Sequence, residues 1–170
     1  MKKIKKIFSV IVKKIIYILD GINNRVYTDL YYKFLKSQGI KFIGRPNYIA
    51  SNAYIDGQGY NYITIGKDVV ISREVMLLTH DYSIENVLHY YGKGTENRTT
   101  KIDGSIYIGN NSFIGARASI LPNTHIGDNC IIGACTTVKG EIPDNSVVIG
   151  NPAKIIKNIK DISIEKYLEK

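Results

Sequence analysis

The 170-residue chain has no tryptophan, two cysteines and four prolines. Cys130 and Cys135 form no CxxC pair and have no spacing typical of a zinc site. We therefore interpret them as packed free thiols of a reducing compartment. The apolar stretch near the N-terminus is interrupted by Lys13 and Lys14, which leaves it too short to span a bilayer. It has no convincing small-residue cleavage site, so we do not predict a signal peptide.

Acidic residues are scarce only at the start of the chain. Residues 1–40 hold nine Lys or Arg and two Asp, a net charge of +7, out of +8 for the whole chain. The remaining chain is near neutral, which argues against a nucleic-acid partner. At about 100° per residue, residues 2–19 predict an amphipathic helix with apolar and basic faces: Ile4, Ile7, Phe8, Ile11, Ile15 and Ile18 against Lys2, Lys3, Lys5, Lys6, Lys13 and Lys14. Such a helix can lie on an anionic membrane surface or pack on protein, and both alternatives stay open.

A second helix is predicted over residues 24–37, ended by Gly39. Its apolar stripe is expected to pack on the first part of the next segment: Val26, Tyr27, Leu30, Tyr31 and Phe34. We therefore divide the chain into a helical segment (1–40), a central domain (41–153) and a charged helical tail (154–170).

A period of six residues dominates the central domain. From Ile102 onward a branched aliphatic residue recurs at every sixth position: Ile102, Ile108, Ile114, Ile120, Ile126, Ile132 and Val138. Glycine often follows it directly, and the fourth position after it is mostly small: Ser112, Ala118, Thr124, Cys130 and Thr136. A fixed short period indicates repeat architecture. It predicts a coil of short strands with the aliphatic side chains inside and the glycines turning the corners with positive φ. An antiparallel barrel would instead show alternation with period two.

The same period begins earlier and is broken twice. Ile43, Ile49 and Ile55 are in phase, and after a break at residues 57–62 the phase resumes at Ile65, Ile71 and Leu77. Residues 81–101 have no period and are polar and aromatic, so we expect an excursion loop. A long loop on a regular scaffold is usually functional.

The pattern [Ile/Leu/Val]-Gly-x-x-small-x, with the closing run from Gly133-Ala134 to Asn151-Pro152-Ala153-Lys154, resembles the hexapeptide-repeat acyltransferases. The resemblance covers about residues 41–158. It implies an all-β fold, a left-handed parallel β-helix with N-terminal helices, an excursion loop and a short C-terminal helix. It also implies acetyl-CoA as donor, a saccharide acceptor and a homotrimer with sites between subunits.

His80 stands where the coil gives way to the loop. Acetyl transfer from a thioester to a hydroxyl needs a base, and an imidazole suits that task. The position is similar to that of the catalytic His in the family's O-acetyltransferases, so we interpret His80 as the general base. Its second nitrogen needs a partner, and Asp81 and Asp56 are both candidates; Asp56 also matches the family's acceptor-contacting position. No Ser or Cys stands beside His80, which fits direct transfer in a ternary complex.

The other two histidines give no metal signature. His80, His89 and His125 are separated by 9 and 36 positions, with no pair three to five apart. We expect no metal site, and surface or structural roles for His89 and His125.

The resemblance also implies a set of residues that bind coenzyme A: Phe113, Ala116, Ala134, Lys139, Lys154 and Lys157. Phe113 replaces a family Trp, and the small residues let the pantetheine arm lie against backbone. The lysines suit its phosphates. Two departures are Asn123, where the family has Gly, and Gly140, where it often has Lys.

The expected function is acetyl-CoA-dependent O-acetylation of a surface polysaccharide or its precursor, in the cytoplasm or on the inner face of the membrane. An amino-sugar N-acetyltransferase of the same fold and a non-catalytic trimeric scaffold are the alternatives. A serine acetyltransferase would carry a longer helical N-terminal domain than forty residues.

Overall fold

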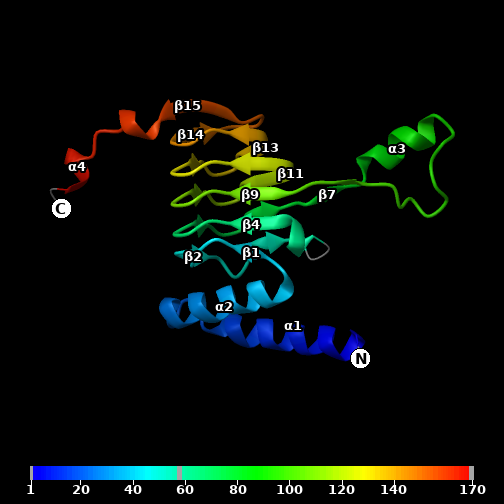
Figure 1. Cartoon of the computed structure of the whole chain (residues 1–170), viewed down its shortest axis with the longest axis horizontal. Coiled ribbons are helices and arrows are strands. Elements are labelled where there is room, and N and C mark those ends of the chain that lie inside the picture. Colours follow the sequence, from blue (N-terminus) through cyan, green and yellow to red (C-terminus); the bar gives the residue numbers. More distant parts are fainter. Residues whose placement is uncertain (1, 57–58, 169–170) are drawn as a thin grey trace.

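A stack of short parallel strands forms the body of the molecule, with two helices at one end and an arm projecting from its side (Figure 1). The computed structural model describes residues 2–56 and 59–168, without the side chains of residues 2–9 and 166. Between the third and fourth coils, each strand residue pairs with the residue eighteen positions later, as in Phe113 with Ile131 and Ser119 with Thr137. Three six-residue sides therefore complete one turn, as the period predicts.

Each coil contributes one short strand to each of three sides. The first side holds β1 (Lys41–Phe42), β4 (Ile63–Ile65), β9 (Ile106–Ile108) and the last residues of β11 (Ser119–Ile126) and β13 (Thr137–Ile142). The second side holds β2 (Tyr48–Ile49), β5 (Val70–Ile71), β10 (Phe113–Ile114), β12 (Ile131–Ile132) and β14 (Ser146–Ile149). The third side holds β3 (Tyr54–Ile55), β6 (Met76–Leu77) and the first residues of β11 and β13.

The core of the coil is the predicted one. The in-phase aliphatic and small residues from Ile108 to Val138 are all buried: Ile108, Ser112, Ile114, Ala118, Ile120, Thr124, Ile126, Cys130, Ile132, Thr136 and Val138. Ile102 is an exception, because it lies outside the coil on the arm and is 43% exposed. Ile43 is exposed too, and Phe42 takes its place opposite Ile65. Within the break at 57–62, residues 57 and 58 lie outside the description, and a 3-10 turn, η1 (Tyr60–Tyr62), follows.

The repeat glycines serve a different purpose from the predicted one. The corner residues with positive φ come third after each aliphatic position, for example Asn111, Arg117 and Asn129, and the repeat glycines are not among them. A Cβ on Gly115 would instead lie 2.6 Å from the backbone nitrogen of Ala134 in the next coil. Glycine is needed here because the stacked corners approach too closely for any side chain.

Helices α1 (Lys2–Ile18) and α2 (Asn24–Gln38) cover the end of the stack beneath β1 and β2 (Figure 1). Tyr27 of α2 is buried and donates its hydroxyl to the Ile49 carbonyl at 2.7 Å, which ties the helix to the first coil. Gly39 ends α2, as predicted, and adopts the left-handed conformation. In the stripe predicted on α2, Val26 and Leu30 are exposed.

The described part of the stripe predicted on α1 does not face the protein. Val12, Ile16 and Leu19 pack toward the core instead, while Ile11, Ile15 and Ile18 are exposed; Ile4, Ile7 and Phe8 lie outside the described side chains. Throughout the described residues, every helix falls short of the length or apolar character that crossing a membrane requires.

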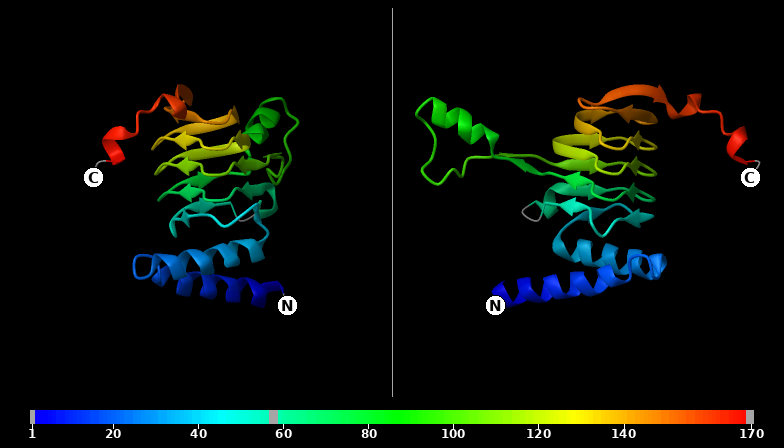
Figure 2. Two further views of the ribbon diagram at one scale, coloured as in Figure 1. Left: turned by 60° about the vertical axis from the view of Figure 1, so that its left-hand side comes forward. Right: turned by 180° about the vertical axis from the view of Figure 1, so that it is seen from behind.

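The excursion is a folded arm rather than an irregular loop. An antiparallel ribbon of β7 (His80–Asp81) and β8 (Ile102–Asp103) leads to α3 (Ser83–Tyr90), which stands away from the coil (Figure 2). The Glu85 carboxylate, buried within the arm, accepts hydrogen bonds from the backbone N–H groups of Thr95 (2.6 Å) and Thr100 (2.8 Å). These bonds hold the returning chain against α3.

The C-terminal segment departs from the predicted helical tail. Residues 154–158 form β15 (Lys154–Asn158), which pairs antiparallel with β14 and covers the far end of the second side. A 3-10 turn, η2 (Ile159–Asp161), and the short helix α4 (Glu165–Leu168) follow.

Candidate active site

His80 lies where the chain leaves the second coil for the arm, one rung from Asp56. Asp56 follows β3, and its backbone N–H donates to the Leu77 carbonyl at 3.1 Å, so the two coils are in register here. The Asp56 carboxylate is 2% exposed and contacts Nδ1 of His80. It also accepts the Thr79 hydroxyl at 2.7 Å. With Nδ1 held against a carboxylate, Nε2 is the ring nitrogen left to take a proton.

Asp81, the other candidate partner, has a different role. Its carboxylate accepts the backbone N–H of Ser83 at 2.8 Å, at the start of α3. That hydrogen bond lowers the pKa of Asp81. The structure thus brings Asp56, and not Asp81, to Nδ1 of His80. The ring of Tyr82 lies edge-on to the imidazole, with centroids 5.1 Å apart.

A cavity of about 300 Å³ opens beside His80, at the corner between the third and first sides. Its walls come from the arm and from two further coils: Leu78, His80, Asp81, Ile102, Leu121, Pro122, Asn123 and Lys139. The apolar walls limit water, while His80, Asn123 and Lys139 supply polar groups. Sequence reasoning missed Leu78, Ile102, Leu121 and Pro122 as site residues, because nothing local to them signals chemistry. Asn123 adopts φ 62°, which asparagine tolerates at this corner.

Five of the six residues expected to bind coenzyme A lie elsewhere. Phe113 points outward on the second side, and Ala116 and Ala134 lie at the corner that follows it. Lys154 and Lys157 are on β15, at the far end of the second side. Within one chain, the third side separates these residues from His80. Lys139 is the sixth, and it lines the His80 cavity.

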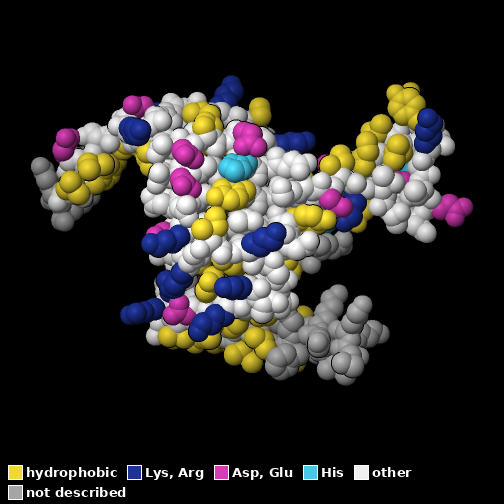
Figure 3. Space-filling view, viewed as in Figure 1, with side chains coloured by type: hydrophobic (Ala, Val, Ile, Leu, Met, Phe, Trp, Pro, Cys, Tyr) yellow, Lys and Arg dark blue, Asp and Glu magenta, His cyan; other side chains and the backbone are white. Residues whose placement is uncertain are grey.

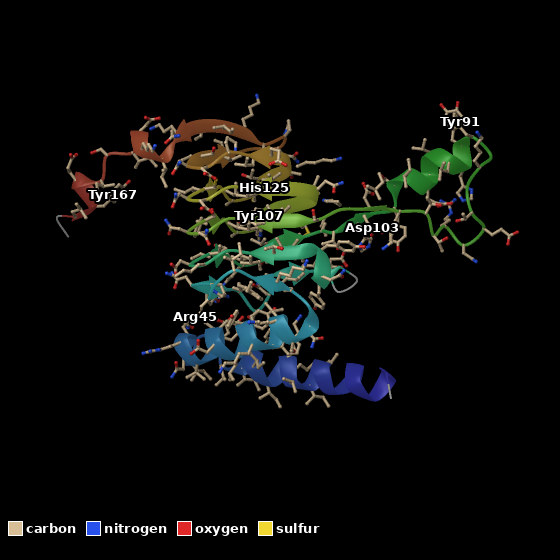
Figure 4. All side chains as sticks on the ribbon, in the orientation of Figure 1. Arg45, Tyr91, Asp103, Tyr107, His125 and Tyr167 are labelled. Atoms are coloured by element: carbon tan, nitrogen blue, oxygen red, sulfur yellow. The ribbon has the colours of Figure 1, made fainter. Side chains whose placement is uncertain are left out.

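The remaining histidines have local partners. Nε2 of His89 lies 3.0 Å from the Thr95 carbonyl oxygen and 3.4 Å from a carboxylate oxygen of Glu85, inside the arm. His125 stacks on Tyr107 on the outer face of the first side, with ring centroids 4.4 Å apart (Figure 4). Among residues 2–56 and 59–168, no group of three His, Cys, Asp or Glu is placed to hold a metal ion.

Comparisons with known proteins concern the repeat and the fold of this chain. Residues 105–140 match the family "Bacterial transferase hexapeptide (six repeats)". The putative lipopolysaccharide biosynthesis O-acetyl transferase WbbJ of Escherichia coli K12 is 32% identical over 110 residues, which cover 62% of this chain and 55% of that protein. The galactoside O-acetyltransferase of the same strain is 35% identical over 107 residues, 63% of this chain and 49% of that protein. The chain thus spans about half the length of these curated relatives.

Solved structures show the fold. The hexapeptide-repeat acetyltransferase VCA0836 of Vibrio cholerae matches with a TM-score of 0.63 and 17% identity, over 90% of this chain and 89% of that one. A galactoside acetyltransferase in complex with coenzyme A matches with a TM-score of 0.57 and 25% identity, over 88% and 80%. The predicted fold, a left-handed parallel β-helix, is therefore confirmed.

Proposed function

This chain is a hexapeptide-repeat protein with the left-handed β-helix fold, and from that premise we propose that it is an acetyl-CoA-dependent O-acetyltransferase acting on a saccharide hydroxyl. The observation that carries the proposal is the contact between buried Asp56 and His80 at the mouth of an apolar-walled cavity. A base held by a buried carboxylate is what activation of a hydroxyl requires.

The proposed reaction is direct transfer. His80 takes the proton of the acceptor hydroxyl as the oxygen attacks the thioester carbonyl carbon, and Asp56 stabilises the imidazolium that forms. A backbone amide or a donor on the arm would stabilise the tetrahedral oxyanion. When the C–S bond breaks, the coenzyme A thiolate leaves and the proton on His80 is returned to it. The acetyl ester and free coenzyme A are the products.

The donor groove is proposed to form between subunits. Phe113, Ala116 and Ala134 offer an aromatic and small-residue surface, and Lys154 and Lys157 offer charge for phosphates. Since these residues lie a full side away from His80, a second copy would have to bring its own second side to the cavity. We therefore propose a homotrimer.

Surface polysaccharide or a precursor of it is the proposed acceptor, which the names of the lipopolysaccharide and galactoside relatives support. We place the reaction in the cytoplasm, on the inner face of the membrane, with residues 2–19 on the lipid surface. The exposed Ile11, Ile15 and Ile18 support that contact. An amino-sugar N-acetyltransferase is the second candidate, because the same base could activate an ammonium group.

An acetyl-CoA consumption assay against a panel of hydroxyl and amino sugars tests the proposal. We expect thiol release with a hydroxyl sugar, and a loss of at least about a hundredfold in kcat for His80→Ala, a typical contribution of a general base. Coenzyme A binding, followed by calorimetry, should survive the substitution. Turnover of amino sugars alone would favour the second candidate. Failure to bind acetyl-CoA would identify a scaffold without activity.

A further inference from the structure

A second cavity lies away from the His80 site, between α2 and the first coil. It measures about 590 Å³, and every residue that lines it carries a polar or charged group on its side chain. Arg25, Thr28 and Asp29 of α2 form one wall, and Arg45 and Tyr48 of the first coil form the other. The proposed acetyl transfer uses none of these residues.

The cavity has an unsatisfied preference for an anion. Arg45 donates to Asp29 at 2.6 Å, and that bond is the main cause of the lowered pKa of Asp29. Arg25 lines the same cavity, and in the described part of the chain no hydrogen bond or ion pair engages its guanidinium. Two guanidinium groups therefore face a single carboxylate.

Thr28 supplies the second, independent observation. Its side chain lines the cavity, the residue is only 4% exposed, and its hydroxyl has no hydrogen-bond partner among the described residues. Because its oxygen is not fully buried, the hydroxyl can be reached from the cavity. A ligand oxygen inside the cavity would satisfy it. The positive end of the α2 dipole lies beside the cavity and favours the same charge.

An apolar surface adjoins this cavity. The connection between the helices is tied to it, because Tyr48 donates its hydroxyl to Asp20 at 2.9 Å. Ile18 and Ile22 flank Asp20 and are 66% and 74% exposed. They continue the exposed row of Ile11 and Ile15. In Figure 3, hydrophobic side chains follow the lower edge of this end, with Lys and Arg side chains directly above them.

Two partners could cover the exposed isoleucines, a lipid surface or a second copy of the chain, and the charge of α1 favours the lipid surface. Helix α1 contains six lysines and no acidic residue, so two copies meeting on this face would bring twelve like charges together. An anionic bilayer has the opposite charge and accepts exposed isoleucines at its interface.

We propose that the cavity formed by Arg25, Thr28 and Arg45 binds the phosphate of an anionic phospholipid while the row from Ile11 to Ile22 enters the bilayer interface. The coil would then stand on the membrane by its helical end. This adds a headgroup site outside residues 2–19, and it does not depend on the acetyl transfer.

Flotation of the full chain with two kinds of vesicle tests the proposal: pure phosphatidylcholine, and phosphatidylcholine with 30% phosphatidylglycerol. Arg25→Gln is compared with Lys14→Gln, which removes the same charge from the exposed surface of α1 without touching the cavity. Loss of one general surface charge weakens binding to anionic vesicles about fivefold. We expect that loss for Lys14→Gln and at least a further fivefold for Arg25→Gln. Thr28→Val, which keeps the shape and removes the hydroxyl, should weaken binding severalfold without changing the charge.

Equal losses for Arg25→Gln and Lys14→Gln would overturn the headgroup site. Wild-type binding to anionic vesicles no stronger than to neutral ones would overturn the membrane surface as well. Inorganic phosphate provides the third arm: if it binds by calorimetry while vesicles do not, the cavity serves a soluble phosphate compound and the lipid proposal fails. Circular dichroism of each variant establishes that the comparisons concern folded protein.

Discussion

Replacing Asp56 by asparagine would remove the negative charge behind His80 and leave the size of the side chain unchanged. The amide oxygen of the variant can still accept a hydrogen bond from Nδ1 or from Thr79. What it cannot do is compensate the positive charge that His80 acquires when it takes the proton from the acceptor. The variant therefore isolates the electrostatic part of the Asp56–His80 contact.

The magnitude follows from burial and contact distance. Two unit charges about 4 Å apart interact by about 4 kcal/mol at an effective dielectric constant of about 20. Asp56 is 2% exposed, so water cannot replace the lost charge. Allowing for the remaining hydrogen bond, we expect a loss of about 3–4 kcal/mol in the transition state. At 1.36 kcal/mol per decade, kcat falls about 10²- to 10³-fold.

Asp81→Asn is the matched control, because it removes the same charge one position away from His80. Its carboxylate serves the Ser83 amide, which the asparagine oxygen can also accept, so we expect kcat within about threefold of wild type. Thiol release measures kcat and KM, and calorimetry measures coenzyme A binding, which should be unchanged in both variants. Equal losses in the two variants, or an Asp56→Asn enzyme with a third or more of wild-type kcat, would refute the reasoning.

Two further predictions concern the scaffold and the arm. Gly115→Ala should lower the free energy of unfolding by about 1–3 kcal/mol, because the new Cβ meets the backbone of the next coil. Gly133→Ala is the control at the same repeat position, where the new Cβ meets chiefly the Ile149 side chain, 2.8 Å away. By chemical denaturation, we expect the control to lose less than half as much free energy of unfolding. Hydrogen bonds, first those from Thr100, lower the pKa of Glu85 to about 2. Because the pKa of Glu85 is lower in the folded arm than in the unfolded chain, its carboxylate stabilises the arm fully above pH 4.5, and this stabilisation is lost as the pH falls toward 2. Hydrogen exchange in the arm, corrected for intrinsic rates, should therefore quicken between pH 5 and pH 3, and Glu85→Gln should abolish that dependence. An arm with the same protection at both pH values in wild type would contradict the role of Glu85.

The six-residue period was sufficient to predict the coil, its core and its small inward positions. Each side of the coil turns an aliphatic side chain and a small one inward, so the pattern predicts burial directly, as Ile114 and Cys130 illustrate. The pattern could not report why glycine follows. Gly115 is required by the backbone of a residue nineteen positions away, and only the stacking of coils reveals that approach.

In the helical segment, periodicity predicted the helices but not which face of α1 packs on the protein. Periodicity located α1 and α2, and Gly39 marked the end of α2. Periodicity assigned an apolar face to α1, but packing against α2 uses Ile16 instead and leaves Ile15 exposed. A helix with apolar residues around much of its circumference can be docked in more than one rotation, and the neighbour decides.

The sequence alone determined the scaffold and singled out His80, because both are written in local patterns: a period, and a histidine where that period stops. Only the tertiary structure decided which carboxylate serves His80. Asp81 is adjacent in the chain, yet successive residues of a strand point to opposite faces, and its side chain turns to Ser83. Asp56 is 24 positions away, and the stacking of one coil on the next brings it into contact with the imidazole. The residues expected to bind coenzyme A are likewise divided in space. Lys139 lines the cavity beside His80, whereas the other five lie on the second side or at the corner that follows it.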